Sequence, residues 1–186
     1  EELREVAQEV HYYSRSKNPF QLLMPLPFIV RSRMNPALLQ RLLKDEHPIL
    51  FEGIHTCGFI GHPKLSKRWI GIRAHNIEHD YYHGLAAIEP NFFKRWFFKT
   101  EAKKLEKYER WIFQKANEIL SVSHADNDYF QKKYNKGVYI PVFNPLHWGV
   151  GLRGRGNHAL LHGNLSVIEN IKGIEFVLDE VWESDF

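Results

Sequence analysis

Short apolar runs alternate along the chain with longer amphipathic stretches. Four runs of β-branched and aliphatic residues, each bounded by polar residues, predict buried strands: residues 48–52, 69–72, 116–123 and 138–141. Three stretches with apolar side chains at helical spacing or with a helix-start signal predict helices: residues 35–44, 91–117 and 123–134. Strands that alternate with helices predict an α/β fold, in which helices flank a parallel sheet.

The first thirty residues carry weaker signals. Residues 1–8 have the pattern of a helix end, and residues 10–13, Val-His-Tyr-Tyr, that of a short strand. Three prolines lie in or just before residues 20–29. Proline removes a backbone donor and disrupts a regular helix, so we expect an extended segment there. Residues 58–67 are predicted to be a polar loop.

The last third of the chain changes character. Residues 144–157 contain one proline, four glycines and two arginines, a composition typical of a linker. Residues 158–162 then predict a strand and residues 168–182 a helix. One strand and one helix cannot form a core. We therefore expect a domain over 1–143, a linker over 144–157, and the incomplete start of a second domain over 158–186.

The sharpest change from apolar to polar follows the run that starts at Trp69. Five polar or ionisable residues then come within seven positions: Arg73, His75, Asn76, Glu78 and His79. Open α/β sheets bind ligands at the carboxyl ends of their strands. The sequence therefore places the functional centre here.

The same residues match a competing motif. His75-Asn-Ile-Glu-His79 has the H-x-x-E-H spacing of zinc hydrolases, in which two histidines one helical turn apart hold zinc and the glutamate acts as a base. That chemistry needs one continuous helix, whereas a predicted strand runs directly into His75. A zinc hydrolase and a non-catalytic binding domain stand as alternatives.

Five fragments, in this order, resemble a bacterial glycosyltransferase of family 4. They are Phe51-Glu-Gly-Ile-His55, Arg73-Ala-His-Asn-Ile-Glu-His-Asp-Tyr-Tyr82, Glu101-Ala-Lys-Lys-Leu-Glu-Lys-Tyr-Glu109, Ile119-Leu-Ser-Val-Ser123 with Asp126, and His162-Gly-Asn-Leu-Ser-Val-Ile-Glu-Asn170. The resemblance implies the GT-B architecture of two Rossmann-like domains, here the acceptor-side domain and the start of the second. It also implies sugar transfer from a nucleotide-sugar to a glycan or lipid-linked acceptor, with retention, in cell-envelope polysaccharide synthesis. No cofactor or metal is implied, since the nucleotide-sugar is a substrate.

The resemblance also implies roles for single residues. We expect His75 to contact the transferring sugar or the acceptor, with Glu78 and Arg73 shaping its loop. Acceptor contacts are expected from His55, Asn76, Ser123 and Asp126, and donor contacts from Gly163, Asn164, Glu169 and Asn170. Many relatives have arginine and lysine near the last two asparagines, and their later donor-binding glutamates fall beyond Phe186. This segment alone is therefore expected to be inactive.

Charge and aromatic residues gather in residues 92–115. Eight basic and three acidic residues give this stretch a charge of +5, although the whole chain carries only +3. Its first two turns hold Phe92, Phe93, Trp96, Phe97 and Phe98. Aromatics mixed with lysine and arginine suit an anionic membrane surface. We expect no nucleic-acid partner, because no nucleic-acid module is recognisable.

The cellular location is inferred from further features. A single cysteine fits a reducing compartment, and no signal peptide or apolar run of about 18 residues is present. The prediction is a cytoplasmic protein, peripheral on the inner face of the plasma membrane.

Overall fold

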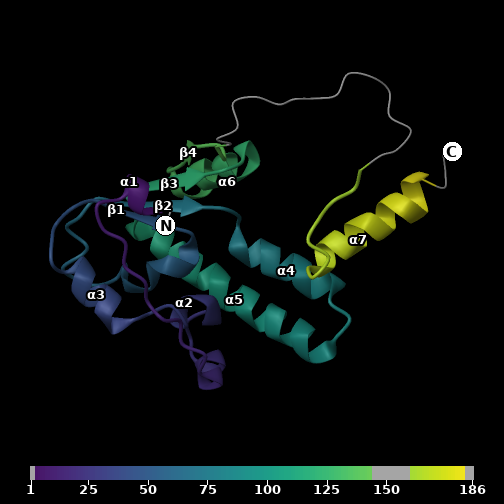
Figure 1. The fold of residues 1–186 in the computed structure, drawn as a ribbon, viewed down its shortest axis with the longest axis horizontal. Coiled ribbons are helices and arrows are strands. Elements are labelled where there is room, and N and C mark those ends of the chain that lie inside the picture. The colour runs from purple at the N-terminus through teal and green to yellow at the C-terminus, as the bar shows by residue number, and fades with distance from the viewer. Residues whose placement is uncertain (1–2, 144–159, 183–186) are drawn as a thin grey trace.

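A four-stranded parallel sheet forms the centre of the protein. The computed structural model describes residues 3–143 and 160–182. The strands β1 (Ile49–Glu52), β2 (Ile70–Ala74), β3 (Glu118–Ser121) and β4 (Val138–Tyr139) lie side by side in that order, and all three pairings are parallel (Figure 1). Parallel strands need crossover connections, which the intervening helices provide. The predicted α/β class is confirmed, and the arrangement is compatible with a Rossmann-like fold.

The two faces of the sheet differ. One face carries Phe51, Ile72 and Ile119, which are in register and are buried together with Ile112 and Phe113 of the long helix α5 (Phe92–Lys115). On the opposite face Leu50 is 55% exposed and Trp69 is 46% exposed. Because side chains alternate between the faces of a strand, the core lies on one side of the sheet.

Helix α4 (Glu78–Ile88) and α5 follow β2 in the chain and precede β3, and together they form an antiparallel helical hairpin (Figure 1). The rings of Tyr82 and Phe98 meet edge to face across the hairpin, with 5.8 Å between centroids. The sequence analysis predicted no helix between residues 72 and 91 and expected Glu78 in a loop, so α4 was missed. Ile77 at the N-cap position makes no side-chain cap, so the usual start signal is missing.

The other predicted helices are confirmed, and side chains cap their starts. Asn35 accepts a hydrogen bond from Ala37 N before α3 (Pro36–Leu42), and Asn91 accepts one from Lys94 N before α5. Ser123 accepts one from Asp126 N before α6 (His124–Tyr134). Each cap satisfies an amide that has no partner within its helix.

The N-terminal segment is more helical than its prolines suggested. After α1 (Leu3–Val6), residues 10–13 form no strand. The region predicted to be extended instead contains the 3-10 helix η1 (Pro19–Leu23) and the short helix α2 (Phe28–Arg31). Proline at the first position of a helical turn is favourable because its missing N–H would have no partner there. Another 3-10 helix, η2 (Ile54–Phe59), follows β1 and reaches into the predicted loop.

The C-terminal unit consists of α7 (Ile168–Phe176), which continues as the π-helical segment η3 (Val177–Trp182). This confirms the predicted helix. Residues 160–162 are not a strand, while the rest of that predicted strand and the whole predicted linker lie outside the described residues. The unit meets the rest of the protein at α4, where the Tyr81 hydroxyl donates to Glu169 Oε1 at 2.6 Å.

Candidate functional site

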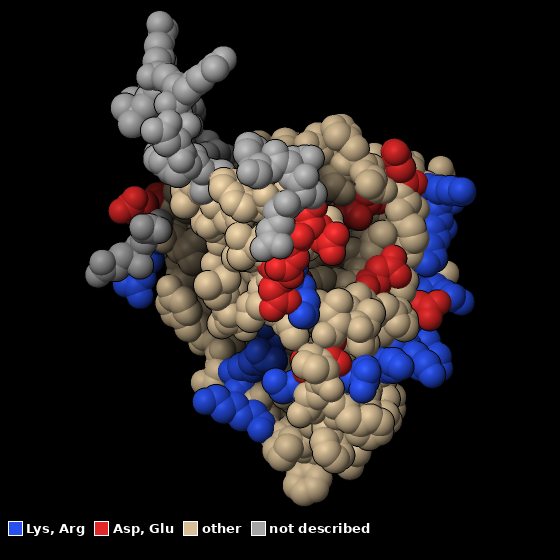
Figure 2. Space-filling view, turned by 90° about the vertical axis from the view of Figure 1, so that its right-hand side faces the viewer, with Lys and Arg blue, Asp and Glu red and all other residues tan. Residues whose placement is uncertain are grey.

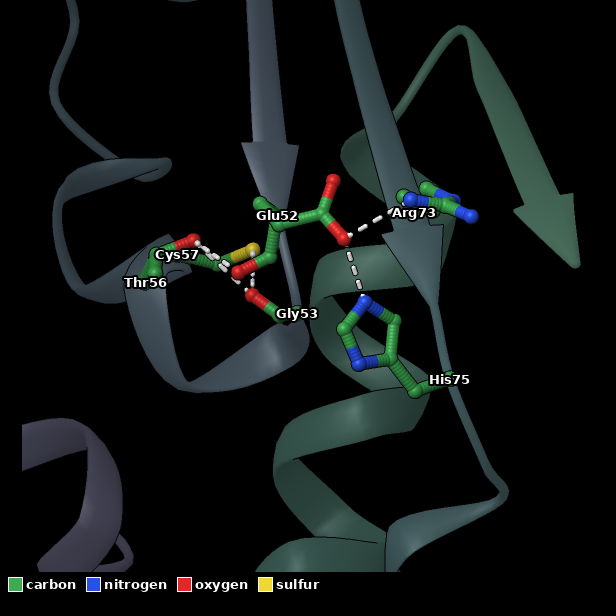
Figure 3. A network of polar contacts seen from close by, with 6 residues as sticks. All are labelled: Glu52, Gly53, Thr56, Cys57, Arg73 and His75. Carbon is green, nitrogen blue, oxygen red and sulfur yellow. Dashed lines mark hydrogen bonds and ion pairs between the residues drawn. The ribbon is translucent and has the colours of Figure 1, made fainter. Parts of the chain in front are cut away.

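Glu52, at the carboxyl end of β1, is the centre of a polar cluster (Figure 3). Arg73 Nη1 donates to Glu52 Oε1 at 3.2 Å, and His75 Nε2 contacts the same oxygen. The sheet register explains the meeting, because Glu52 and Arg73 are paired on adjacent strands and His75 follows two residues later. Glu52 thus holds His75 and Arg73 together, a role that the sequence analysis did not give it.

Gly53 lets the chain turn sharply after Glu52. Its φ is +80°, a conformation that residues with a Cβ rarely adopt, and a Cβ there would lie 2.5 Å from Cε1 of His55. The Thr56 hydroxyl closes the turn by donating to the Gly53 carbonyl at 2.8 Å. His55 is consequently half-buried against the Gly53 backbone at the same sheet edge as His75.

Two arginines from the N-terminal segment act electrostatically on this edge. Burial lowers the pKa of His55, and this is the largest effect. The guanidinium group of Arg33, the His75 ring and Arg15 lower it further, in that order. Arg33 donates to the Ile29 carbonyl at 2.7 Å, and Arg15 Nε donates to Ser32 Oγ at 2.8 Å. These hydrogen bonds fix the positions of Arg33 and Arg15. The sequence analysis proposed no functional residue in this N-terminal segment.

Glu78 is the first residue of α4 and faces the same group of charges. Its own burial, followed by the nearby Glu109 carboxylate, raises its pKa, while His75 and Arg33 act in the opposite direction. Arg73 and His75 share Glu52, and the His75 ring acts electrostatically on both His55 and Glu78, so the structure brings these four residues near one another. The guanidinium groups of Arg15, Arg33 and Arg73 thus act on a site that also holds the carboxylates of Glu52, Glu78 and Glu109. Guanidinium groups held in this way can bind an anionic ligand such as a phosphate.

The second histidine of the H-x-x-E-H motif points elsewhere. His79 is buried between α4 and α5, where its Nδ1 contacts Glu109, a residue only 1% exposed. His75 precedes the helix and contacts Glu52 instead, so the pentapeptide is not one continuous helix. Among residues 3–143 and 160–182, no group of three or more His, Cys, Asp or Glu residues is placed to hold a metal ion. The geometry gives the zinc alternative no support.

The predicted acceptor residues lie at neighbouring strand ends. Asn76 is exposed in the bend between β2 and α4. Ser123 and Asp126 follow β3, where Ser123 Oγ accepts from Asp126 N at 3.1 Å, so capping accounts for their contact with each other. Nearby, the ring of His124 stacks on Tyr139, with 3.9 Å between centroids, which places an aromatic surface that the sequence analysis did not single out at this edge.

Three of the four predicted donor residues, Gly163, Glu169 and Asn170, line a separate pocket of about 210 Å³ beside α7, and Asn164 is bonded to one of them. Asn164 Oδ1 accepts from Ser166 N and Oγ at 3.0 and 2.7 Å, and Asn170 Nδ2 donates to the Asn164 carbonyl at 3.0 Å. Glu169 contacts Tyr81 on α4. The four predicted donor residues therefore lie close together, and their polar contacts do not reach Arg73 or His75.

Comparison with protein families, curated proteins and solved structures found no match. In the described part of the chain, no helix has both the length and the apolar character needed to cross a bilayer.

Proposed function

We propose that the chain is the acceptor-side part of a retaining glycosyltransferase of the GT-B type. On this proposal it moves a sugar from a nucleotide-sugar to a glycan or lipid-linked acceptor, and residues 158–186 begin the nucleotide-sugar-binding domain. The observation that carries the proposal is the cluster of Arg73, His75 and Glu52 at the carboxyl edge of a parallel sheet, with Arg33 and Arg15 nearby. Ligands of open α/β sheets bind at that edge.

The reaction needs positive charge and positioning more than a nucleophile. In transfer with retention, the bond between the anomeric carbon and the diphosphate oxygen breaks, and a bond to the acceptor oxygen forms on the same face. The acceptor proton passes to the departing phosphate oxygen. Fixed cations stabilise the negative charge that develops on the leaving group. Arg73 and Arg33 are held by hydrogen bonds, so they need little reorganisation during the reaction.

His75 is the proposed contact to the transferring sugar or the acceptor hydroxyl. Its side chain is 47% exposed, so it is accessible to a ligand, and Glu52 fixes its orientation. Holding a reacting hydroxyl in line with its target supplies a large part of the rate of such a transfer. Glu52 is therefore proposed as a positioning residue that acts through the imidazole.

Release of nucleoside diphosphate from a panel of nucleotide-sugars, measured with the protein that carries this chain and a complete second domain, tests the proposal. We expect His75→Ala to lower turnover by about 100-fold or more, as for other lost transition-state contacts. His83→Ala is the matched control, because His83 is exposed on α4, away from the strand ends. Unchanged thermal unfolding of both variants shows that the fold is intact.

Two outcomes would contradict the proposal. Near-normal turnover by His75→Ala would remove the role of that residue. A wild-type protein that binds glycans but turns over no nucleotide-sugar would point to the alternative, a non-catalytic binding domain.

A further inference from the structure

A large apolar groove lies between η1 and the first turns of α5. Its volume is about 730 Å³, and its lining includes Phe20, Leu23, Phe93, Trp96 and Phe97. Several of these side chains are largely in solvent, with Leu23 82% exposed and Phe93 79% exposed. Segments η1 and α5 are some seventy residues apart in the sequence. The sequence analysis therefore singled out the aromatic residues of α5 but not those of η1.

Polar contacts join the two sides of the groove. Lys104 Nζ donates to the Leu22 carbonyl at 2.7 Å and pairs with Glu101 at 2.8 Å. Glu101, which is 1% exposed, also accepts from the Phe28 amide at 2.5 Å. The C-terminal end of η1 and the start of α2 are therefore both bonded to α5. Exposed apolar patches that are rimmed by polar residues in this way mark interaction sites.

A basic stripe runs along α5 next to the groove. Lys99, Lys103, Lys107 and Arg110 are exposed and follow Trp96 at spacings of three or four residues, so they lie on one side of the helix. In Figure 2, Lys and Arg side chains lie around the uncharged lower part of the molecule. The two views share the vertical axis, so this part is the lower part of Figure 1, where η1 and the start of α5 lie.

We propose that the groove and the basic stripe together form a docking surface for an anionic lipid bilayer. Aromatic side chains favour the level of the lipid headgroups, and lysines beside them attract anionic lipids. A second copy of the chain would bring a basic stripe against a basic stripe, which charge repulsion opposes. Binding to lipid does not depend on sugar transfer, so the two proposals can fail separately.

Flotation with vesicles tests the surface on the whole chain, without any assay of activity. We expect binding to vesicles of three parts phosphatidylcholine and one part phosphatidylglycerol, and much weaker binding to phosphatidylcholine alone. The double variant Lys103→Glu, Lys107→Glu should lower the partition coefficient by about tenfold or more. Its matched control is Lys64→Glu, Lys67→Glu, which reverses two exposed lysines of the loop before β2 and should bind as the wild type does.

The apolar part of the surface has its own variant pair. Phe93→Ser with Trp96→Ser should also abolish most binding, whereas Trp69→Ser, at an exposed tryptophan on the bare sheet face, should not. Circular dichroism confirms that each variant folds. Equal binding to neutral and anionic vesicles, no binding to either, or equal loss in the controls would overturn the proposal. So would self-association without lipid that depends on Phe93 and Trp96.

Discussion

Two glutamates join α4 to its neighbours, and they do so in different ways. Glu109 of α5 is 1% exposed and contacts both the ring and the amide of His79. Glu169 of α7 accepts one hydrogen bond from Tyr81, a residue 41% exposed to solvent. The first contact lies within the α4–α5 hairpin next to the sheet, and the second lies at the surface.

The candidate site has two parts, the residues at the strand ends and the pocket beside α7, and they differ in how they are held. Residues at the strand ends depend on β1, β2 and α4 for their positions, so they belong to one packed body. The pocket beside α7 is built from its own loop, and α7 has no buried residue. We infer that the proposed acceptor side is held in place by packing, whereas the proposed donor side depends on further contacts for a fixed position.

Removing each glutamate measures this difference directly. Glu109→Ala should lower the free energy of unfolding by about 3 kcal/mol, because it leaves His79 buried without its partner. Glu169→Ala should cost less than about 1 kcal/mol, as is usual for contacts near the surface. Urea denaturation followed by circular dichroism gives both values. Equal losses would show that α7 is as much a part of the packed body as α5.

The turn after β1 offers a second test of the packed side. Gly53→Ala should destabilise the protein by about 2 kcal/mol, because a residue with a Cβ is strained at this φ and the Cβ would collide with His55. Gly84→Ala is the control: nothing lies within 4 Å of its Cβ position in α4, and alanine favours helices, so a gain of up to about 1 kcal/mol is expected. A neutral Gly53→Ala would mean that the turn relaxes without cost.

Most of the sheet and the long helix could be predicted because their signals are local. Ile70 and Ile72 form an apolar run, and Asn91 precedes a stretch with helical periodicity. Helix α4 was missed because its first turn is polar and uncapped, and its stability comes from packing on α5. Tertiary contacts overrode the local pattern there.

Sequence signals for the candidate site were also partly local and partly dependent on the fold. His75 and Arg73 were singled out because they come directly after the apolar run of residues 69–72. Their link to Glu52 depends on the pairing of β1 with β2, and the positions of Arg15 and Arg33 depend on α2, to which both are hydrogen-bonded. Such contacts join residues far apart in the sequence, so no local pattern contains them.

The smallest expected effect concerns the pH dependence of two histidines. Contact with Glu109 raises the pKa of His79 above its ordinary value of 6.5, whereas burial, followed by Arg33, lowers that of His55. The contribution of His79 to stability is therefore complete below pH 6.5 and is lost as the pH rises through its folded-state pKa. The contribution of His55 is instead complete above pH 6.5 and is lost as the pH falls, because the unfolded chain binds a proton there more readily than the folded protein does.

Comparing each variant with the wild type isolates these effects from the other titrating groups. The stability advantage of the wild type over His79→Gln should shrink above pH 6.5, and its advantage over His55→Gln should shrink below pH 6.5. Ring signals in an NMR titration should bracket the ordinary value, with His79 above and His55 below. If both histidines titrated on the same side, then either Glu109 would not contact His79 in solution, or His55 would not be buried beside Arg33.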